Sequence, residues 1–172
     1  MPAPSGTFLF ETTVLSAFAL VGRLDLLEAR YSSRACWVDA VHAEVLAGIG
    51  EHPSLGDVLV SAWLGPPIEV FAVAEIERVR QRLGAGRHNR RHLGEAASIV
   101  VARREGWTLA CDDFDAGRVA RDEGLPVVTT PMILRALVRH GQLTAGEASG
   151  LLLHLVEGQG RRLPVPDEAW FQ

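Results

Sequence analysis

The sequence of 172 residues contains no lysine, and all 17 of its basic residues are arginine. Without an amine side chain, the chain cannot form a Schiff base with a carbonyl substrate, and it lacks the lysine of a phosphate-binding loop. Phosphatase-like and receiver-like enzymes need a lysine near their nucleophilic aspartate. Although Asp113 and Asp115 could offer such an aspartate, the missing lysine argues against that class.

Cysteine and long apolar runs are also scarce. Cys36 and Cys111 have no Cys-x-x-Cys spacing and no nearby pair of histidines, so buried core thiols are the simplest interpretation. No apolar run approaches the roughly 20 residues that a membrane-spanning helix needs. Glu11 interrupts the N-terminal apolar segment, which argues against a signal peptide. We therefore expect a cytoplasmic protein with no membrane partner.

Short strand-like runs alternate with longer helical runs along the chain. We expect strands at residues 7–10, 35–38, 68–72, 107–111 and 126–128, with helices between them. This alternation predicts an α/β fold in which a mostly parallel sheet is covered on both faces. The length fits a single domain spanning residues 1–172, in which residues 158–172 form a C-terminal tail.

Carboxylates follow the two best-marked strands. Glu11 comes directly after the first strand, and Asp112, Asp113 and Asp115 come directly after the strand at 107–111. The carboxyl ends of parallel strands form the edge at which sites in α/β sheets are built. We therefore expect these acids to lie close together.

Two glutamates join this set from helices. Glu44 shares a helix face with Val41 and Val45, where a carboxylate needs a partner because burying it alone is costly. Glu95 lies in the first turn of a helix, where the helix dipole favours negative charge. Several converging carboxylates repel one another, and a hard divalent cation relieves that repulsion. A metal-bound water can attack a phosphodiester bond, so the acids indicate hydrolysis that depends on Mg²⁺ or Mn²⁺.

In their order and spacing these segments resemble the PIN-domain family, which includes the ribonuclease toxins of bacterial toxin–antitoxin pairs. The matching segments are residues 10–15 (FETTVL), 41–45 (VHAEV), 93–97 (LGEAA) and 109–116 (LACDDFDA). The resemblance runs from about residue 7 to residue 163. It implies a three-layer α/β/α sandwich and cleavage of RNA with Mg²⁺ or Mn²⁺. The partners it implies are an antitoxin protein and a second copy of the chain, because proteins of this kind often form dimers.

Carried over position by position, the resemblance also implies roles for individual residues. The catalytic metal ligands would be Glu11, Glu44, Glu95 and Asp113, with Asp115 as a further ligand, Asp112 as a supporting acid, and Thr12 or Thr13 positioning a metal-bound water. The family's first acid is normally Asp, and the extra methylene of Glu11 moves the carboxylate by about 1.5 Å. This departure leaves open a second hypothesis, a catalytically weakened or inactive module that binds RNA or a partner protein.

A basic segment leads into Glu95. The stretch from residue 78 to residue 94 contains six arginines and no acid. Because guanidinium forks suit phosphate, we expect RNA to contact the arginines nearest Glu95, which are Arg87, Arg90 and Arg91. A solvated charged surface and a contact for an acidic partner peptide are the other interpretations.

Overall fold

The computed structural model describes residues 6–84 and 92–172. Its strands β1 (Phe8–Phe10), β2 (Ala35–Cys36), β3 (Thr108–Ala110) and β4 (Val127–Val128) form one sheet in the order β2-β1-β3-β4. Every pairing is parallel, and Leu9 lies opposite Cys36 on one side and opposite Leu109 on the other. The predicted parallel sheet is therefore confirmed.

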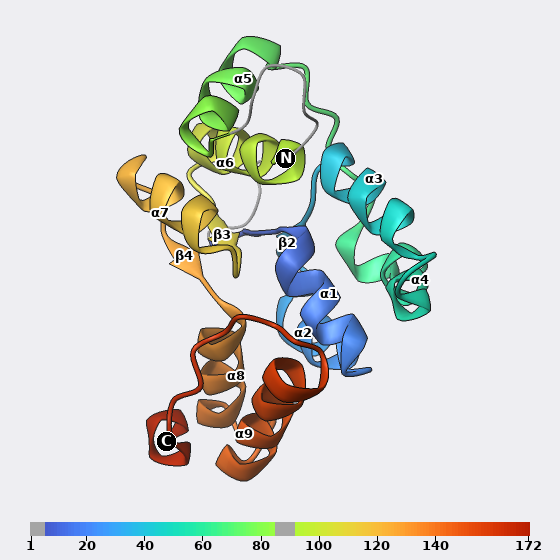
Figure 1. The fold of residues 1–172 in the computed structure, drawn as a ribbon, viewed down its shortest axis with the longest axis vertical. Coiled ribbons are helices and arrows are strands. Elements are labelled where there is room, and N and C mark those ends of the chain that lie inside the picture. Colours follow the sequence, from blue (N-terminus) through green and yellow to red (C-terminus); the bar gives the residue numbers. More distant parts are fainter. Residues whose placement is uncertain (1–5, 85–91) are drawn as a thin grey trace.

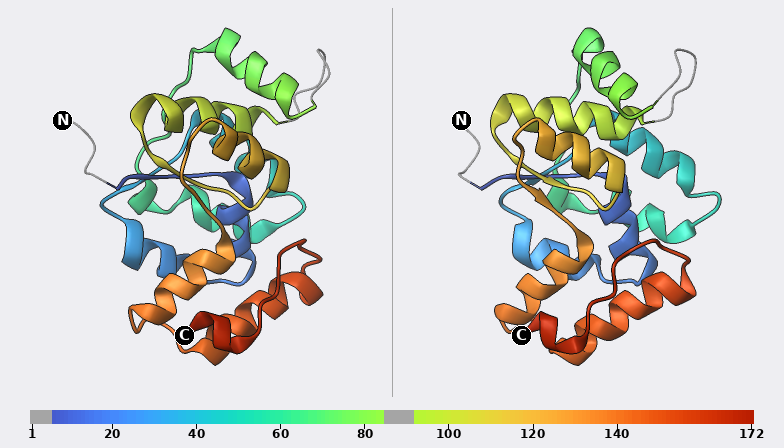
Figure 2. Two further views of the ribbon diagram at one scale, coloured as in Figure 1. Left: turned by 90° about the vertical axis from the view of Figure 1, so that its left-hand side faces the viewer. Right: turned by 60° about the vertical axis from the view of Figure 1, so that its left-hand side comes forward.

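Helices connect the strands. They are α1 (Thr12–Leu20), α2 (Leu24–Tyr31), α3 (Asp39–Gly48), η1 (Pro53–Leu55), α4 (Gly56–Leu59), η2 (Ala62–Leu64), α5 (Val73–Arg82), α6 (Leu93–Glu105), α7 (Phe114–Asp122), α8 (Thr130–Arg139), α9 (Ala145–Leu153), η3 (His154–Gly158) and η4 (Glu168–Phe171). Figures 1 and 2 show α5, α6 and α7 on one side of the sheet and α1, α2, α8 and α9 on the other. This is the three-layer α/β/α arrangement that the resemblance implies.

The two central strands are the most deeply buried part of the sheet. Leu9, Phe10 and Leu109 are fully buried, and burial of such a side chain stabilises the fold by roughly 1.5–3 kcal/mol. Small residues on α6, including Ala96 and Ala97, are also buried, so this helix can approach β1 and β3 closely. The carboxyl ends of β1 and β3 therefore lie next to the closely packed core.

The strand order reverses between β1 and β3. The chain leaves β1 for β2 on one side, and later returns to place β3 on the other side of β1. The backbone N–H of Glu11 donates to the carbonyl of Ala110 over 3.0 Å, so the pairing with β3 continues to Glu11. A reversal of this kind opens a crevice at the carboxyl edge of a parallel sheet, which is where such folds place their sites.

The expected strand at residues 68–72 is wrong except at its first residue. Ile68 forms an isolated parallel bridge with Val38, and its backbone bonds with Trp37 and Asp39. Helix α3 begins at Asp39, so the neighbouring chain is no longer extended where Val70 and Phe71 would need a partner. The β-branched and aromatic residues of this segment therefore have no extended neighbouring strand with which to form backbone hydrogen bonds.

The C-terminal end packs against α8 and α9. Phe171 is fully buried, and the guanidinium of Arg135 lies over the ring of Trp170 at 4.7 Å from its centroid. Helix α9 begins with the capping box that Thr144 and Glu147 form. Among the residues that the structure describes, no helix has the length and apolar character to cross a bilayer.

Candidate active site

Glu11 is a buried carboxyl group at the junction of β1 and α1. Its side chain is 1% exposed, and the hydroxyl of Thr13 donates to its Oε2 over 2.5 Å. Burial raises the pKa of Glu11 to about 8, and the charges of Glu95 and Glu44 also raise it, whereas hydrogen bonds with Thr13 and Cys111 act in the opposite direction. Without a cation nearby, Glu11 therefore keeps its proton at neutral pH.

The two threonines at the start of α1 donate hydrogen bonds to different carboxylates. The hydroxyl of Thr13 donates to Glu11 and accepts the backbone N–H of Asp112 over 2.9 Å. Thr13 thereby ties the end of β1 to the end of β3. The hydroxyl of Thr12 donates to Oε2 of Glu44 over 2.5 Å. Consecutive helical side chains point in directions about 100° apart, which lets the pair reach two different carboxylates.

Glu44 and Glu95 come from α3 and from the first turn of α6. The backbone N–H of Gly94 donates to Oε1 of Glu44 over 2.9 Å. Burial raises the pKa of Glu44, its hydrogen bonds with Thr12 and Gly94 oppose this, and the charge of Glu95 raises the pKa further. Glu95 is contacted by Nδ1 of His92 at 3.3 Å. Glu11, Glu44 and Glu95 thus form one electrostatically coupled set, which we call the acidic cluster.

The three aspartates after β3 lie in three different environments. Both oxygens of Asp112 accept bonds from Thr130, one from its backbone N–H and one from its hydroxyl, each over 2.6 Å. Asp113 is the N-cap of α7 and accepts the N–H of Ala116 over 2.8 Å. The side chain of Asp115 is 62% exposed and lies 3.6 Å from Arg118. Asp112 is therefore held by α8, Asp113 caps α7, and Asp115 points along α7 towards Arg118.

Replacing Asp112 with alanine should destabilise the protein. Thr130 is 1% exposed, so its N–H and hydroxyl would lose both partners inside the protein. We expect a loss of about 3 kcal/mol in the free energy of unfolding, measured by urea denaturation. Asp115→Ala is the matched control because Asp115 is exposed, and it should change that free energy by less than about 0.5 kcal/mol. Equal stabilities of the two variants would contradict this role of Asp112.

Arg161 is a site residue that sequence reasoning missed. It lies in the segment after α9, and its guanidinium donates to the hydroxyl of Ser16 on α1. Burial lowers the pKa of Arg161, whereas the charges of Asp112 and Glu11 raise it. No local motif marks this arginine, because its partner Ser16 is 145 residues away in the sequence.

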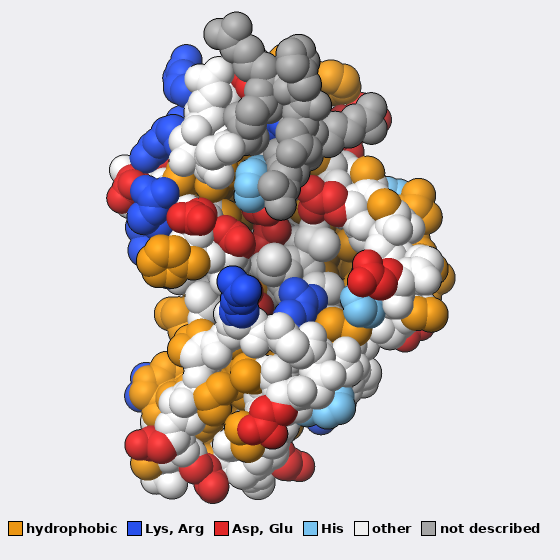
Figure 3. Space-filling view, in the orientation of Figure 1, with side chains coloured by type: hydrophobic (Ala, Val, Ile, Leu, Met, Phe, Trp, Pro, Cys, Tyr) orange, Lys and Arg blue, Asp and Glu red, His pale blue; other side chains and the backbone are white. Residues whose placement is uncertain are grey.

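A pocket of about 140 Å³ lies beside the acidic cluster. Its lining residues are Thr13, Asp112, Asp113, Arg161, Arg162 and Leu163. Figure 3 shows acidic side chains grouped at the middle of this face with basic side chains directly below them. The predicted RNA contacts Arg87, Arg90 and Arg91 lie outside the described residues.

The chemistry of the acidic cluster fits a divalent cation, although the cluster is not closed around one. Within residues 6–84 and 92–172, no group of three or more His, Cys, Asp or Glu side chains has the arrangement to hold a metal ion. Carboxylate oxygens are nevertheless the ligands that Mg²⁺ prefers. The charges of Glu44 and Glu95 raise the pKa of Glu11, and a cation among these three groups would offset that repulsion. The donor set therefore suits a hard cation.

Comparison with known proteins identifies the family of this chain. A family model described as a PIN domain matches residues 7–165. No curated protein and no solved structure matches the chain. The matched region runs from β1 past Arg161 and Arg162, so it contains the whole acidic cluster and all the residues that line the pocket. PIN domains are generally nucleases. The parallel sheet, the acids at its carboxyl edge and the length of the match lead to one assignment: this chain belongs to the PIN-domain family.

Proposed function

We propose that this protein is an endoribonuclease that hydrolyses RNA phosphodiester bonds with Mg²⁺ or Mn²⁺, and that it is the toxin of a toxin–antitoxin pair. The observation that supports the activity most strongly is the acidic cluster. The charges of Glu95 and Glu44 raise the pKa of Glu11, and the charge of Glu95 raises the pKa of Glu44. Among the described residues, no basic side chain forms an ion pair with Glu11 or Glu44.

The residues of the chain have distinct tasks in this proposal. Glu11, Glu44 and Glu95 would hold the cation, with Asp113 at the rim. The cation would supply a water of lowered pKa and stabilise charge on the phosphate. Thr12 and Thr13 orient Glu44 and Glu11 through their hydroxyl groups. Because β1 and α1 are buried in the core, these two hydrogen bonds are already formed in the protein without substrate.

The direct test is cleavage of a mixed RNA substrate with Mg²⁺, with Mn²⁺ and with EDTA. We expect fragments only with metal, and we expect excess Mn²⁺ to restore activity after EDTA treatment. Cleavage at an equal rate in EDTA would overturn the proposal. For the toxin assignment, expression of the protein in bacteria should arrest growth, and the product of a neighbouring antitoxin gene should relieve the arrest.

A weakened or inactive module is the second candidate function, and two observations favour it. Glu11 is a buried acid whose pKa is raised to about 8, and no closed metal-binding group exists in the described parts of the chain. This candidate predicts that Glu11→Asp, which restores the usual residue of the family, increases cleavage. The nuclease proposal predicts a decrease of about 10-fold, because the shorter side chain would lose its bond with Thr13.

Gly94 offers a separate test of the position of Glu44. A Cβ atom at residue 94 would lie 2.5 Å from Oε2 of Glu44, so Gly94→Ala should push this flexible carboxylate out of the cluster. Alanine also favours the helical conformation by about 1 kcal/mol. We therefore expect metal-dependent cleavage to fall by at least about 10-fold while the protein stays folded, measured by RNA cleavage and by thermal denaturation.

Gly150 provides the matched control for this substitution. It lies inside α9, and a Cβ atom there would meet nothing within 4 Å. Gly150→Ala should raise stability by about 0.5–1 kcal/mol and leave cleavage unchanged. Wild-type activity in Gly94→Ala would show that the position of Glu44 is unimportant for the reaction.

A further inference from the structure

The segment that follows α9 carries two arginines back to the acidic cluster. The backbone N–H of Arg161 donates to the carbonyl of Leu155 over 3.0 Å, which anchors the segment where η3 ends. This segment connects η3 to η4, and Figure 1 shows it running beside α1 and the start of α8. Arg161 and Arg162 thus reach the pocket from the end of the chain opposite to Glu11.

Arg161 is held by a neutral group. Its guanidinium donates to Ser16, whose own hydroxyl donates to the carbonyl of Thr13 over 3.2 Å. Asp112 and Glu11 are near enough for their charges to act on Arg161, but within the described chain Arg161 forms no ion pair with either. A half-buried guanidinium without a directly bonded anion is costly, and an incoming anion would lower that cost.

Arg162 adds a second guanidinium to the lining of the pocket. It is exposed, and it forms no hydrogen bond or ion pair with any residue in the described ranges. The pocket is lined by Arg161, Arg162 and Leu163 together with Thr13, Asp112 and Asp113. Its lining therefore contains both guanidinium and carboxylate groups.

We propose that Arg161 and Arg162 form a phosphate clamp that binds the RNA backbone next to the acidic cluster. This inference rests on the proposed function and names the residues that hold the substrate of that site. A phosphate suits this lining, because guanidinium groups bind its oxygens directly, whereas the carboxylates can approach it through a bound cation. The rival interpretation is a structural tether, in which Arg161 only fixes the tail to Ser16.

Binding can be tested separately from cleavage with a fluorescein-labelled single-stranded RNA of mixed sequence in EDTA, followed by anisotropy. Arg161→Gln and Arg162→Gln should each weaken binding by about 5–10-fold. Each should also reduce the slope of log K against log salt concentration by about 0.7, the value for one lost phosphate contact on a single strand. Arg161→Lys should retain the slope, because it retains the charge.

Arg139→Gln is the matched control. Arg139 is an exposed arginine at the last residue of α8, and its replacement removes the same charge without touching the pocket. We expect RNA binding within about 2-fold of the wild-type protein. A tether would give a different pattern: lower thermal stability in Arg161→Gln, no effect of Arg162→Gln, and an unchanged salt slope in both. That pattern would overturn the clamp.

Metal-dependent cleavage by the same variants separates the clamp from the nuclease proposal. If the wild-type protein cleaves RNA and both glutamine variants bind RNA as tightly as the wild-type protein, the clamp is overturned and the nuclease proposal stands. If both variants bind RNA more weakly but the wild-type protein cleaves no RNA with any metal, the nuclease proposal is overturned. The clamp is then supported as an RNA-binding site. Absence of measurable RNA binding by the folded wild-type protein would overturn the clamp.

Discussion

In the absence of metal at about pH 9, Glu11→Gln is expected to be more stable than the wild-type protein by on the order of 4 kcal/mol. Burial is the main reason, since it raises the pKa of Glu11 from 4.5 to about 8. The folded state then binds a proton that the unfolded state releases above about pH 4.5. The stability of the wild-type protein is therefore full below that pH, falls as the pH rises, and reaches its lower limit above about pH 8. Glutamine has no proton to lose and avoids this fall.

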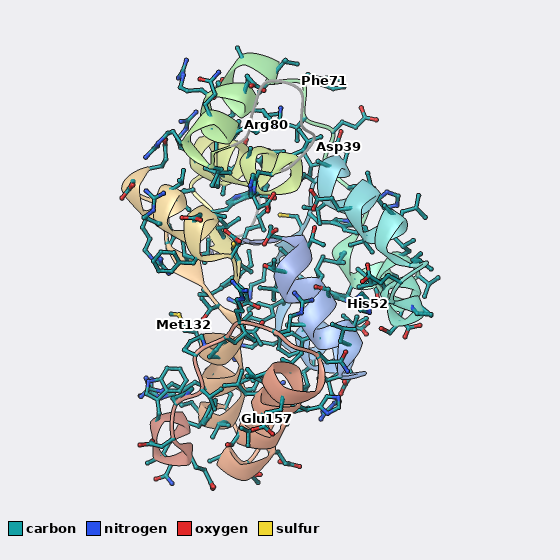
Figure 4. All side chains as sticks on the ribbon, viewed as in Figure 1. Asp39, His52, Phe71, Arg80, Met132 and Glu157 are labelled. Atoms are coloured by element: carbon teal, nitrogen blue, oxygen red, sulfur yellow. The ribbon has the colours of Figure 1, made fainter. Side chains whose placement is uncertain are left out.

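Urea denaturation in EDTA between about pH 5 and pH 9 would measure the effect. The difference between Glu11→Gln and the wild-type protein should grow across that range and level off near its upper end. Glu157→Gln is the control, since Glu157 is exposed and lies in η3, where Figure 4 labels it among the C-terminal helices. A constant difference at all pH values would contradict the buried, protonated state of Glu11.

Addition of Mn²⁺ should reverse the order of the two proteins. A cation in the acidic cluster stabilises the ionised form of Glu11, so binding should raise the stability of the wild-type protein at pH 8. Glu11→Gln loses one charged ligand and should gain much less. An equal gain in both proteins would place the bound metal away from Glu11.

The ends of β1 and β3 show why part of the site is predictable from sequence. Both strands are short, apolar runs that end in an acid, and parallel strands bring their carboxyl ends to one edge. Glu11 and the aspartates after β3 are therefore expected near one another, and the hydrogen bond from the backbone of Asp112 to Thr13 connects the two ends. The local sequence pattern and the topology of the sheet therefore both place Glu11 near Asp112.

Asp112 and Asp113 show which part of the site the sequence does not predict, namely the hydrogen-bond partners of each side chain. Asp112 and Asp113 are equivalent in any sequence pattern, yet one bonds to Thr130 and the other caps α7. The direction of each side chain depends on the backbone turn after β3 and on the later helix α8, which a local pattern does not contain. Arg161 is an extreme case, because its position depends on the packing of α9 and on a contact with Ser16.

The segment at 68–72 shows the same limit for the fold. Its residues have high strand propensity, but a strand also needs an extended neighbour, and β-propensity depends strongly on that context. The neighbouring chain enters α3 at Asp39, and the pairing ends after the Val38–Ile68 bridge. The composition of residues 68–72 contains no information about where α3 begins.

Replacement of Glu44 by glutamine is expected to lower metal-dependent RNA cleavage by at least about 1000-fold, which corresponds to several kcal/mol of lost charge stabilisation. Glu44 accepts bonds from Thr12 and Gly94 through its two oxygens. Glutamine has only one oxygen, and its amide would face one of these donors. The variant therefore loses both the negative charge and the orientation of a ligand, although its size is unchanged.

Single-turnover cleavage and Mn²⁺ binding by calorimetry would measure this effect for Glu44→Gln, with urea denaturation in EDTA as the check on folding. Glu28→Gln is the control, because Glu28 is an exposed acid on α2 and its loss changes the net charge equally. It should cleave RNA at the wild-type rate. If Glu44→Gln keeps most of its activity while remaining folded, Glu44 is not a metal ligand. The reaction would then depend on Glu11, Glu95 and Asp113 alone.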